Sequence, residues 1–444
     1  MYNINWQQFG LKKDPYDTLP LVEGGDLPIE KAFVGRDNEK SALENLFESH
    51  ERLCLTICGD VGVGKTSLAN FHKYIWKYHT QKLLFSFRRE IEACDDLLNK
   101  RSFLIEIIAS VIREIRLLDP KLVKQDLLKK LDYLVDVSQS AGFSGGVEGG
   151  INIYNLGVNF SRDKSGQAPV QLSMAALEGH FLSLVEFIKE NEINGRKYSG
   201  LIVHVNNFDV VLGGENGKTK VIKFFNEIRD TLQTPDVYFI FLGPKNFFKE
   251  TIAEEQRIKG IFVQSPLMIS PLSKTEIVSA LDERMEFLKS PDVANYIKPI
   301  ENEVIYQLYD LYEGDIRSIM SAIKDILGQC SDKLAQPLKT NQALFLLGKE
   351  RLERVKLTVE QVEVLKCFVE SRKPLSQKDV IQKMGKSQSN ISFYYIKPLK
   401  DMNIIEEKHK DGKTIYFGLT KDYEPLKAFF GYKDEIIEDI KNKY

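Results

Sequence analysis

A glycine-rich loop lies between an apolar run and a helical pattern in the stretch LCLTICGDVGVGKTSL, residues 53–68. Gly59, Gly64, Lys65 and Thr66 have the spacing G-x-x-x-x-G-K-[ST]. The glycines of such a loop let backbone N–H groups surround a phosphate, and the following helix directs its positive end at the anion. Lys65 can then reach the β- and γ-phosphates, and the Thr66 hydroxyl can bind Mg²⁺. The sequence therefore predicts a site for ATP or ADP with Mg²⁺. The residues expected around the phosphates are Gly59, Asp60, Val61, Gly62, Val63, Gly64, Lys65, Thr66 and Ser67.

Two amides follow the apolar run LIVHV, residues 201–205, where a buried strand is expected to end. A phosphate-binding ATPase usually has an Asp that orients magnesium and a catalytic Glu at this place, but here Asn206 and Asn207 occupy it. An amide carries no charge and cannot act as a base, and the loss of a general base typically slows a reaction about 10²–10⁴-fold. We therefore predict nucleotide binding with slow or absent hydrolysis. The alternative is ordinary hydrolysis in which Asp209, or a residue elsewhere, supplies the carboxylate.

The elements that position these residues alternate in type between residue 33 and about residue 265. Strands are expected at 53–58, 83–87, 201–205 and 237–242, and helices near 37–49, 65–78, 96–117, 121–136, 173–191 and 218–232. Such alternation is typical of a mostly parallel sheet covered by helices on both faces, so an α/β core is predicted.

Composition and length restrict the class of protein. The 444 residues are 43% hydrophobic and 28% charged, with a formal net charge of −2, which indicates a globular chain long enough for two or three domains. The five cysteines lack the spacing of a metal site and are expected to be free thiols in a reducing compartment. Neither a signal peptide nor an apolar stretch of the length that spans a bilayer is evident. A cytoplasmic protein without a membrane partner is expected.

Changes in pattern divide the chain. We expect an N-terminal arm at 1–32, the core at 33–270, a helical region at 271–350, and a C-terminal domain with a tail at 355–444. A Gly-rich segment at 142–173 has the alternation of a β-hairpin-like insertion. That insertion is either a surface loop or a contact arm for DNA or for a neighbouring subunit.

Several segments together resemble the AAA+ ATPases, and most nearly the replication-initiator (origin-recognition-like) branch and its STAND-related relatives. FVGRDNEKSALENLF (33–47) is similar to the box before the phosphate loop, which implies that Val34, Gly35 and Arg36 line the adenine base. VYFIFLGP (237–244) matches a later strand of the core, and SPLSKTEIVSALDERMEFL (270–288) resembles the start of a helical lid. The resemblance covers roughly residues 33–330. It implies an AAA+ parallel-sheet P-loop core, a helical lid and a homo-oligomer formed through the core.

The resemblance also implies roles for two arginines. Arg317, in YEGDIRSIM (312–320), matches a lid residue that contacts the γ-phosphate. A guanidinium that reaches phosphate from a separate lid would make domain closure depend on the nucleotide, whereas the alternative is a solvated helix arginine. Arg257 stands where the family often has an arginine finger that acts on a neighbour's nucleotide.

The C-terminal segment 357–420 has the pattern of three helices followed by a hairpin. Ser376 is a suitable N-cap for the second helix, Gly385 a suitable stop, and Lys410-Asp411-Gly412 a hairpin turn. This order resembles a winged helix-turn-helix, which places its third helix in the major groove of DNA. Pro398 departs from the pattern, because proline should kink or end that helix early.

Charge favours DNA as the partner of this domain. Residues 371–420 contain ten Lys or Arg and five Asp or Glu, a net charge of +5 in a slightly acidic chain. A winged helix that instead docks a protein partner is the alternative. The residues expected at double-stranded DNA are Lys386, Ser387, Gln388, Ser389 and Asn390 on the third helix and Lys410 and Lys413 on the wing.

These features together favour a nucleotide-gated switch that binds DNA. The main rival is a STAND-type signalling or defence ATPase in which the winged helix serves protein–protein regulation. A third possibility is an ordinary hydrolysing AAA+ ATPase.

Overall fold

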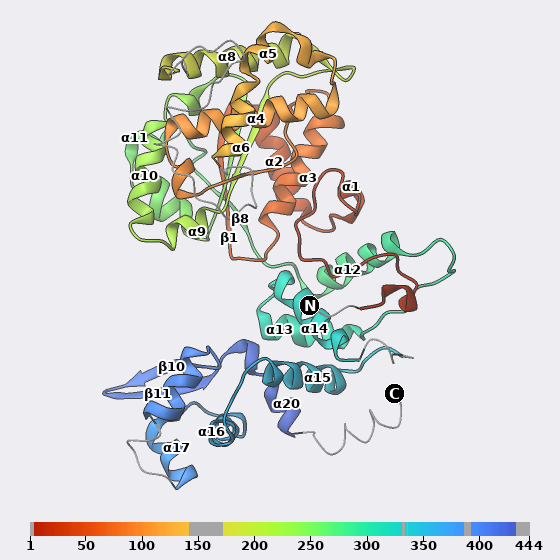
Figure 1. Ribbon diagram of the computed structural model, residues 1–444, viewed down its shortest axis with the longest axis vertical. Coiled ribbons are helices and arrows are strands. Elements are labelled where there is room, and N and C mark those ends of the chain that lie inside the picture. Colours follow the sequence, from red (N-terminus) through yellow and green to blue (C-terminus); the bar gives the residue numbers. More distant parts are fainter. Residues whose placement is uncertain (1–3, 142–171, 331–333, 335, 386–391, 432–444) are drawn as a thin grey trace. The chain divides into compact units, whose positions relative to one another are not determined.

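The computed structural model describes residues 4–141, 172–330, 334, 336–385 and 392–431 (Figure 1). Within it the chain forms two compact units, of which one is residues 19–272 and the other combines residues 1–18 with residues 273–444. The arm expected at 1–32 is thus divided between the two units. The boundary expected after residue 270 falls at Leu272. Most of the insertion predicted at 142–173 lies outside the described residues.

A parallel sheet forms the centre of the unit 19–272. Its strand order is β2-β6-β7-β1-β8, and β3 also pairs with β6; all of these pairings are parallel. This confirms the predicted α/β class. Strands β3 and β8 were missed, because two or three residues are too few to show a period. The strands are β1 (Leu53–Gly59), β2 (Phe85–Ser86), β3 (Ile91–Glu92), β6 (Leu201–Asn206), β7 (Val237–Gly243) and β8 (Leu267–Ile269).

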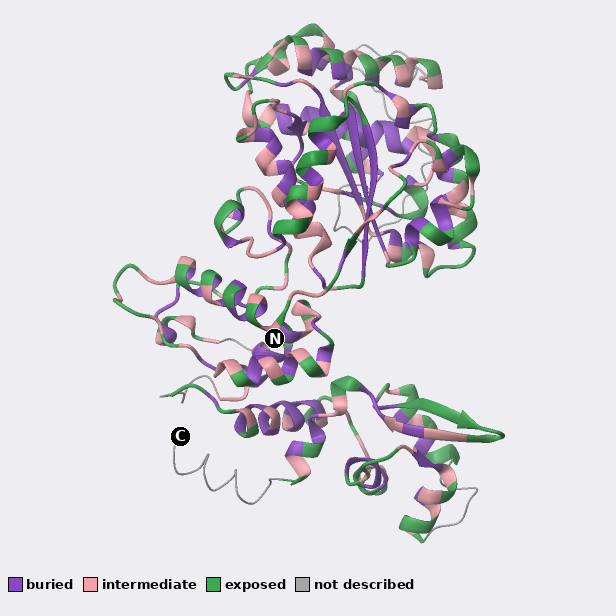
Figure 2. Cartoon of the chain, turned by 180° about the vertical axis from the view of Figure 1, so that it is seen from behind, coloured by how far each residue is buried: buried purple, intermediate pink, exposed green. Residues whose placement is uncertain are grey.

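Helices cover both faces of this sheet (Figure 1), and alternate residues of β1 show why. Leu55 and Ile57 join a hydrophobic core with α2 and α3, whereas Cys54 and Cys58 join the core formed with α4, α8 and α10. Side chains of a strand alternate between its two faces, so a strand buried on both sides is mostly apolar along its whole length. Figure 2 shows the buried strands between the helical layers. These helices are α2 (Asp37–Ser49), α3 (Lys65–Tyr78), α4 (Lys100–Leu118), α8 (Met174–Glu190) and α10 (Gly217–Glu227).

The remaining elements of this unit are short. The helix expected at 121–136 is a 3₁₀ turn followed by two helices, with breaks at Gln125 and Asp132. The elements are α1 (Ile29–Ala32), α5 (Asp126–Leu131), α6 (Tyr133–Ser140), β4 (Glu192–Ile193), β5 (Arg196–Lys197), α9 (Phe208–Leu212) and α11 (Gln256–Lys259).

The second unit contains four helices, and the first residues of the chain form hydrogen bonds with one of them. The Lys12 backbone N–H donates to the Leu288 carbonyl over 2.8 Å, and the Arg284 guanidinium donates to the Asp17 carbonyl over 2.7 Å. The N-terminal residues are thereby held along α12, whose Ser273 N-cap forms a capping box with Glu276. The four helices are α12 (Lys274–Leu288), α13 (Asn302–Tyr312), α14 (Ile316–Gly328) and α15 (Thr340–Glu353).

The C-terminal part of this unit has the elements of the predicted winged helix. Ser376 caps the second helix with a capping box, and Gly385 ends it at φ 63°, as expected. The hairpin predicted around Gly412 pairs Asp411 with Thr414, and β11 also pairs with a short strand before the second helix. The elements are α16 (Val359–Val369), β9 (Leu375–Ser376), α17 (Gln377–Met384), α19 (Lys397–Asp401), β10 (Ile405–Asp411), β11 (Thr414–Leu419) and α20 (Leu426–Gly431).

Pro398 interrupts the third helix of this domain, as its chemistry predicts. A π-helical turn over Ser392–Ile396 precedes α19, in which Pro398 occupies the first turn. Proline has no N–H to donate to the carbonyl four residues earlier, which is that of Tyr394. The Gln361 side-chain amide of α16 donates to this carbonyl over 3.4 Å. The neighbouring helix thus supplies the hydrogen bond that proline cannot make.

Two buried histidines predict loss of stability in acid. His72 of α3 is 2% exposed, and its burial lowers its pKa to about 3; burial also holds the pKa of His204 in β6 well below its usual value. The unfolded chain takes up these protons near pH 6.5. The stability that the two neutral histidines contribute is therefore fully present above that pH and is lost as the pH drops toward 3. Each histidine contributes about 1.4 kcal/mol per pH unit in this window. Urea unfolding at pH 7.5 and pH 5 checks this.

A substitution tests the assignment to His72. The His72→Phe variant keeps the ring contacts with Phe47 and Trp76 but removes the titrating group, so we expect its stability to fall less steeply with acid. The exposed His79 provides the matched control, because His79→Phe leaves the buried rings untouched. Equal pH slopes for the two variants would contradict the assignment.

Candidate nucleotide site and candidate DNA face

The phosphate loop connects β1 to α3, and its glycines are required for two different reasons. A Cβ added at Gly59 would lie 2.5 Å from the carbonyl oxygen of Ile269, so close packing against β8 excludes a side chain there. Gly62 and Gly64 have φ values of 79° and 93°, in the left-handed region that favours glycine. The loop therefore has the backbone conformation that lets several N–H groups face one anion.

The loop lysine lies over the backbone of its own loop. Lys65 is the first residue of α3, and its Nζ donates to the carbonyl oxygens of Gly59 over 2.9 Å and Asp60 over 2.8 Å. Its ammonium group is thus placed at the positive end of a 14-residue helix. Asp60 and Val61 are exposed, which leaves the outer side of the loop open to solvent. A phosphate that approaches from this side meets both the helix end and the lysine.

The structure brings one of the two asparagines to the loop. Asn206 Nδ2 donates to Thr66 Oγ1 over 3.0 Å, although the two residues are 140 positions apart in the chain. Asn206 ends β6, and carboxyl ends of parallel strands meet at one edge of a sheet. The hydroxyl predicted to bind Mg²⁺ therefore has a neutral amide as its neighbour, where a carboxylate would have added a negative charge.

The next residues turn away from the strand. Asn207 has φ 66° and ψ 23°, a left-handed conformation that asparagine tolerates better than most residues. This left-handed conformation is a structural reason for an asparagine at position 207, and the sequence did not reveal it. Asp209 is the second residue of α9 and is half-buried. The strand has ended before Asp209, so its carboxylate is not confined to the face that strand alternation would give it.

Arg36 contacts the phosphate loop from outside. Its Nη2 donates to the Val63 carbonyl over 2.7 Å, its Nη1 donates to Glu39 over 3.1 Å, and the residue is only 8% exposed. The adjacent Gly35 and Arg36 both have positive φ. The predicted role of Val34, Gly35 and Arg36 at the base stays a prediction. The support that Arg36 gives to the loop is a function that the sequence did not indicate.

Residues 19–32, here called the N-terminal strap, contribute a second support that the sequence did not reveal. The Leu21 backbone N–H donates to Ser67 Oγ over 3.2 Å, and the Asn70 side chain donates to the Leu21 carbonyl over 3.1 Å. Ser67 therefore holds the strap against α3 directly after the phosphate loop. The strap is rich in proline, glycine and acidic residues, and it has no periodicity from which this contact could be predicted.

A buried ionic network anchors the strap farther along α3. Lys77 is fully buried, and its Nζ lies 3.0 Å from Glu23 of the strap and 2.7 Å from Glu114 of α4. Tyr78 also donates to Glu23 over 2.6 Å, and the Arg88 backbone N–H donates to Glu114 over 3.0 Å. Two carboxylates thus share one buried lysine, and the strap, α3 and α4 are joined by it.

The two predicted arginines are exposed. Arg317 lies in the first turn of α14, after the left-handed pair Glu313-Gly314 and the Asp315 N-cap. It belongs to the unit that contains α12, whereas the phosphate loop belongs to the other unit. Arg257 is exposed on α11. Their roles at the γ-phosphate and as an arginine finger stay predictions.

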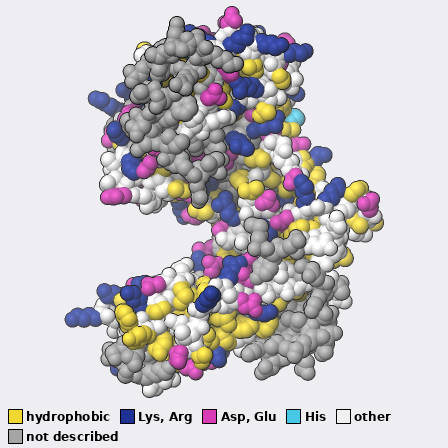
Figure 3. All heavy atoms as spheres, in the orientation of Figure 1, with side chains coloured by type: hydrophobic (Ala, Val, Ile, Leu, Met, Phe, Trp, Pro, Cys, Tyr) yellow, Lys and Arg dark blue, Asp and Glu magenta, His cyan; other side chains and the backbone are white. Residues whose placement is uncertain are grey.

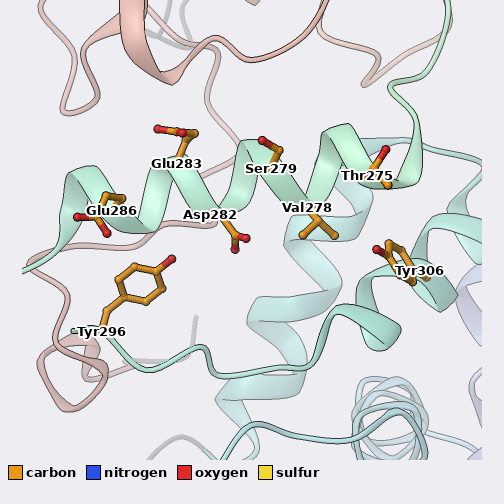
Figure 4. A pocket seen from close by; sticks show the side chains of 8 residues that line it. All are labelled: Thr275, Val278, Ser279, Asp282, Glu283, Glu286, Tyr296 and Tyr306. Atoms are coloured by element: carbon orange, nitrogen blue, oxygen red, sulfur yellow. The ribbon is translucent and has the colours of Figure 1, made fainter.

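An acidic groove of about 370 Å³ runs along α12 (Figure 4). Two of its three carboxylates have a cation nearby, because Lys298 lies 2.6 Å from Asp282 and Lys289 lies 2.6 Å from Glu286. Among the described residues no group of three His, Cys, Asp or Glu could hold a metal ion. The groove is therefore not assigned as a site.

The hairpin of β10 and β11 is the predicted wing, and the DNA contacts of its lysines stay a prediction. Lys410 and Lys413 are exposed on either side of the hairpin turn, and Lys and Arg side chains project at its tip in Figure 3. The five residues predicted at the start of the third helix, Lys386 to Asn390, lie outside the described residues. In the part of the chain that the structure describes, no helix is both long and apolar enough to cross a membrane.

Among the solved structures that match this chain are proteins of Aeropyrum pernix and Thermotoga maritima. Orc1 of Aeropyrum pernix in complex with DNA has 12% identity and a TM-score of 0.41, covering 94% of this chain and 97% of that chain. Orc2 of A. pernix (ADPNP–ADP complexes) has 16% identity and a TM-score of 0.43, covering 95% and 99%. The RuvB branch migration motor of Thermotoga maritima has 10% identity and a TM-score of 0.36, covering 86% and 92%.

At these identities and TM-scores the likeness concerns the course of the chain and gives no argument about activity. No family model matches the sequence, and no curated protein matches it.

Proposed function

We propose that this chain is an ATP- or ADP-binding protein with slow or absent hydrolysis, and that the nucleotide controls how its winged helix meets double-stranded DNA. The observation that carries the proposal is the hydrogen bond from Asn206 to Thr66. It places an uncharged amide beside the hydroxyl that would bind Mg²⁺. Nucleotide affinity needs the loop, Lys65 and the end of α3, all of which are present. Hydrolysis needs a base, for which Asn206 and Asn207 are unsuited.

Arg317 would supply the gate. An arginine that contacts the γ-phosphate distinguishes ATP from ADP, and it would change the position of the helices that carry it. Arg317 and the winged helix belong to the same compact unit. A movement of the lid would therefore also move the DNA-binding face. Mg²⁺ would be held by Thr66 and phosphate oxygens, because this ion commonly keeps several waters.

Binding and turnover measured on one purified sample test the first half of the proposal. We expect micromolar or tighter binding of ATP with Mg²⁺, and turnover at least about 100-fold below the 1–10³ s⁻¹ common among enzymes. The Lys65→Ala variant should lose binding, and the Asp209→Asn variant should leave the residual turnover unchanged. Brisk turnover that Asp209→Asn abolishes would instead assign the carboxylate to Asp209 and make the chain an ordinary ATPase.

A gel shift at several salt concentrations tests the second half. True DNA binding releases counterions, so the logarithm of the binding constant should fall by about 0.9 for each phosphate contacted per tenfold rise in salt. The Lys410→Ala/Lys413→Ala variant should reduce that slope. Affinity should also differ between the ATP-bound and ADP-bound protein. Binding that is absent at low salt would contradict the proposal.

One observation favours a STAND-type signalling protein as the second candidate. The winged helix packs on α15 through α20, where a Cβ added at Gly348 would lie 2.5 Å from the Pro425 carbonyl oxygen. A winged helix docked internally in this way could serve regulation instead of DNA. The gel shift separates the two candidates, because only the first requires steep salt dependence.

A further inference from the structure

The third helix of the winged domain presents two exposed aromatic side chains. Phe393 is 63% exposed and Tyr394 is 59% exposed, and both lie in the π-helical turn that precedes α19. Their ring centroids are 5.3 Å apart with the planes near perpendicular. The opposite face of the same segment is buried, with Ile396 at 5% and Leu399 at 0%. The rings therefore do not serve the core of the domain.

Two lysines lie on the same segment as these rings, whose one exposed acidic residue is Asp401 at the end of α19. Lys397 Nζ lies 5.6 Å from the Phe393 ring centroid, and Lys400, three residues farther along the exposed side, pairs with Glu407 of the wing. Lysine is depleted in protein–protein interfaces, whereas phosphate backbones attract it. The exposed face thus combines apolar rings with cations, which fits the major groove better than it fits an apolar protein surface.

Bases differ in what they present in the major groove. Arginine and lysine recognise guanine, and asparagine and glutamine recognise adenine, whereas an apolar side chain such as Phe contacts the C5-methyl group of thymine. Among the described residues of the third helix, 392–401, the exposed side chains that are not cationic or acidic are Ser392, Phe393 and Tyr394. Two adjacent rings offer apolar area for methyl groups and no guanidinium or amide for the other bases.

We propose that Phe393 and Tyr394 contact thymine methyl groups in the major groove and give this protein a preference for thymine-containing duplex DNA. This inference rests on the proposed DNA binding and adds to it the base that is recognised. Each methyl group taken out of water by a ring strengthens binding about fourfold. Lys397 and the wing lysines place the helix on the backbone and contribute equally for every sequence.

Replacement of thymine by deoxyuridine tests the inference, because it removes the methyl group and leaves charge and base pairing intact. The probes are a short duplex of alternating A·T pairs and the same duplex with every thymine replaced by deoxyuridine. We expect the full-length protein to bind the thymine duplex about 4- to 16-fold more tightly, for one or two methyl groups covered. The Phe393→Ala/Tyr394→Ala variant should bind both duplexes with nearly the same affinity.

A matched control separates this effect from a general loss of apolar surface. Leu117 of α4 is 65% exposed, and Phe393 is 63% exposed. The Leu117→Ala variant should keep the full preference for thymine. Unchanged thermal midpoints of all variants would show that they fold. Salt-dependent binding with equal affinity for the two duplexes would overturn this inference and leave the proposed function intact.

Two further outcomes are informative. Absence of duplex binding by the unmodified protein at low salt would overturn the proposed function itself, and this inference with it. Tighter binding to single-stranded DNA than to either duplex would show that the rings stack on bases, and it would overturn the assignment to methyl groups.

Discussion

Replacement of Asn207 by Glu should raise ATP turnover by about 10²–10⁴-fold, the range that a general base contributes. Asn207 follows Asn206 at the end of β6, and Asn206 contacts the Thr66 hydroxyl of the phosphate loop. A carboxylate at this place could accept a proton from water that attacks the γ-phosphate. The measurement is steady-state phosphate release with saturating ATP and Mg²⁺, with nucleotide affinity determined on the same samples.

Because Asn207 has a left-handed backbone, the control variant must carry the same backbone cost as the Glu variant. A glutamate at φ 66° costs about 1–2 kcal/mol of stability, whatever it does to catalysis. Asn207→Gln has the same length and the same backbone cost but no basic group, so its turnover should stay at the level of the unmodified protein. If the Gln and Glu variants turn over equally, the base is elsewhere and the proposal of an inactive amide pair fails.

Replacement of Lys77 by Met should lower the free energy of unfolding of the unit 19–272 by about 3 kcal/mol. Removal of one partner of a buried ion pair leaves the other charge without compensation, which typically costs about 3–5 kcal/mol. Here Arg88 Nε remains 3.3 Å from both Glu23 and Glu114 and offsets part of the loss, so the low end of that range is expected.

The chain offers both a reporter and a control for this test. Its two tryptophans are Trp6 and Trp76, and Trp76 of α3 is 1% exposed, so a Trp6→Phe background makes fluorescence report on the unit 19–272. Lys223→Met breaks a surface pair with Glu227 at 3.8 Å, in which the lysine is 77% exposed, and should change stability by less than about 1 kcal/mol. Equal urea midpoints for the two variants would show that the buried network does not stabilise the unit 19–272.

The strap also makes this stability test informative about the nucleotide site. The backbone N–H of Leu21 in the strap forms a hydrogen bond with Ser67, which directly follows Thr66. If Lys77→Met loosens the strap while the unit stays folded, ATP affinity should fall without any change in the loop residues. That result would show that residues 19–32 support the phosphate loop from a distance.

The sequence by itself determined the local features of this protein. The loop glycines, the apolar strands of the core, the cap at Ser376 and the break at Pro398 follow from backbone conformation and short-range pattern, which act within a few residues. The tertiary structure alone decided which distant groups meet. Asn206 reaches Thr66 only because two strand ends share one edge of the sheet, and Lys77 joins Glu23 to Glu114 only because the strap lies on α3. Such contacts depend on strand order and helix packing, which are set by the burial of the whole core and leave no periodic trace in the residues that make them.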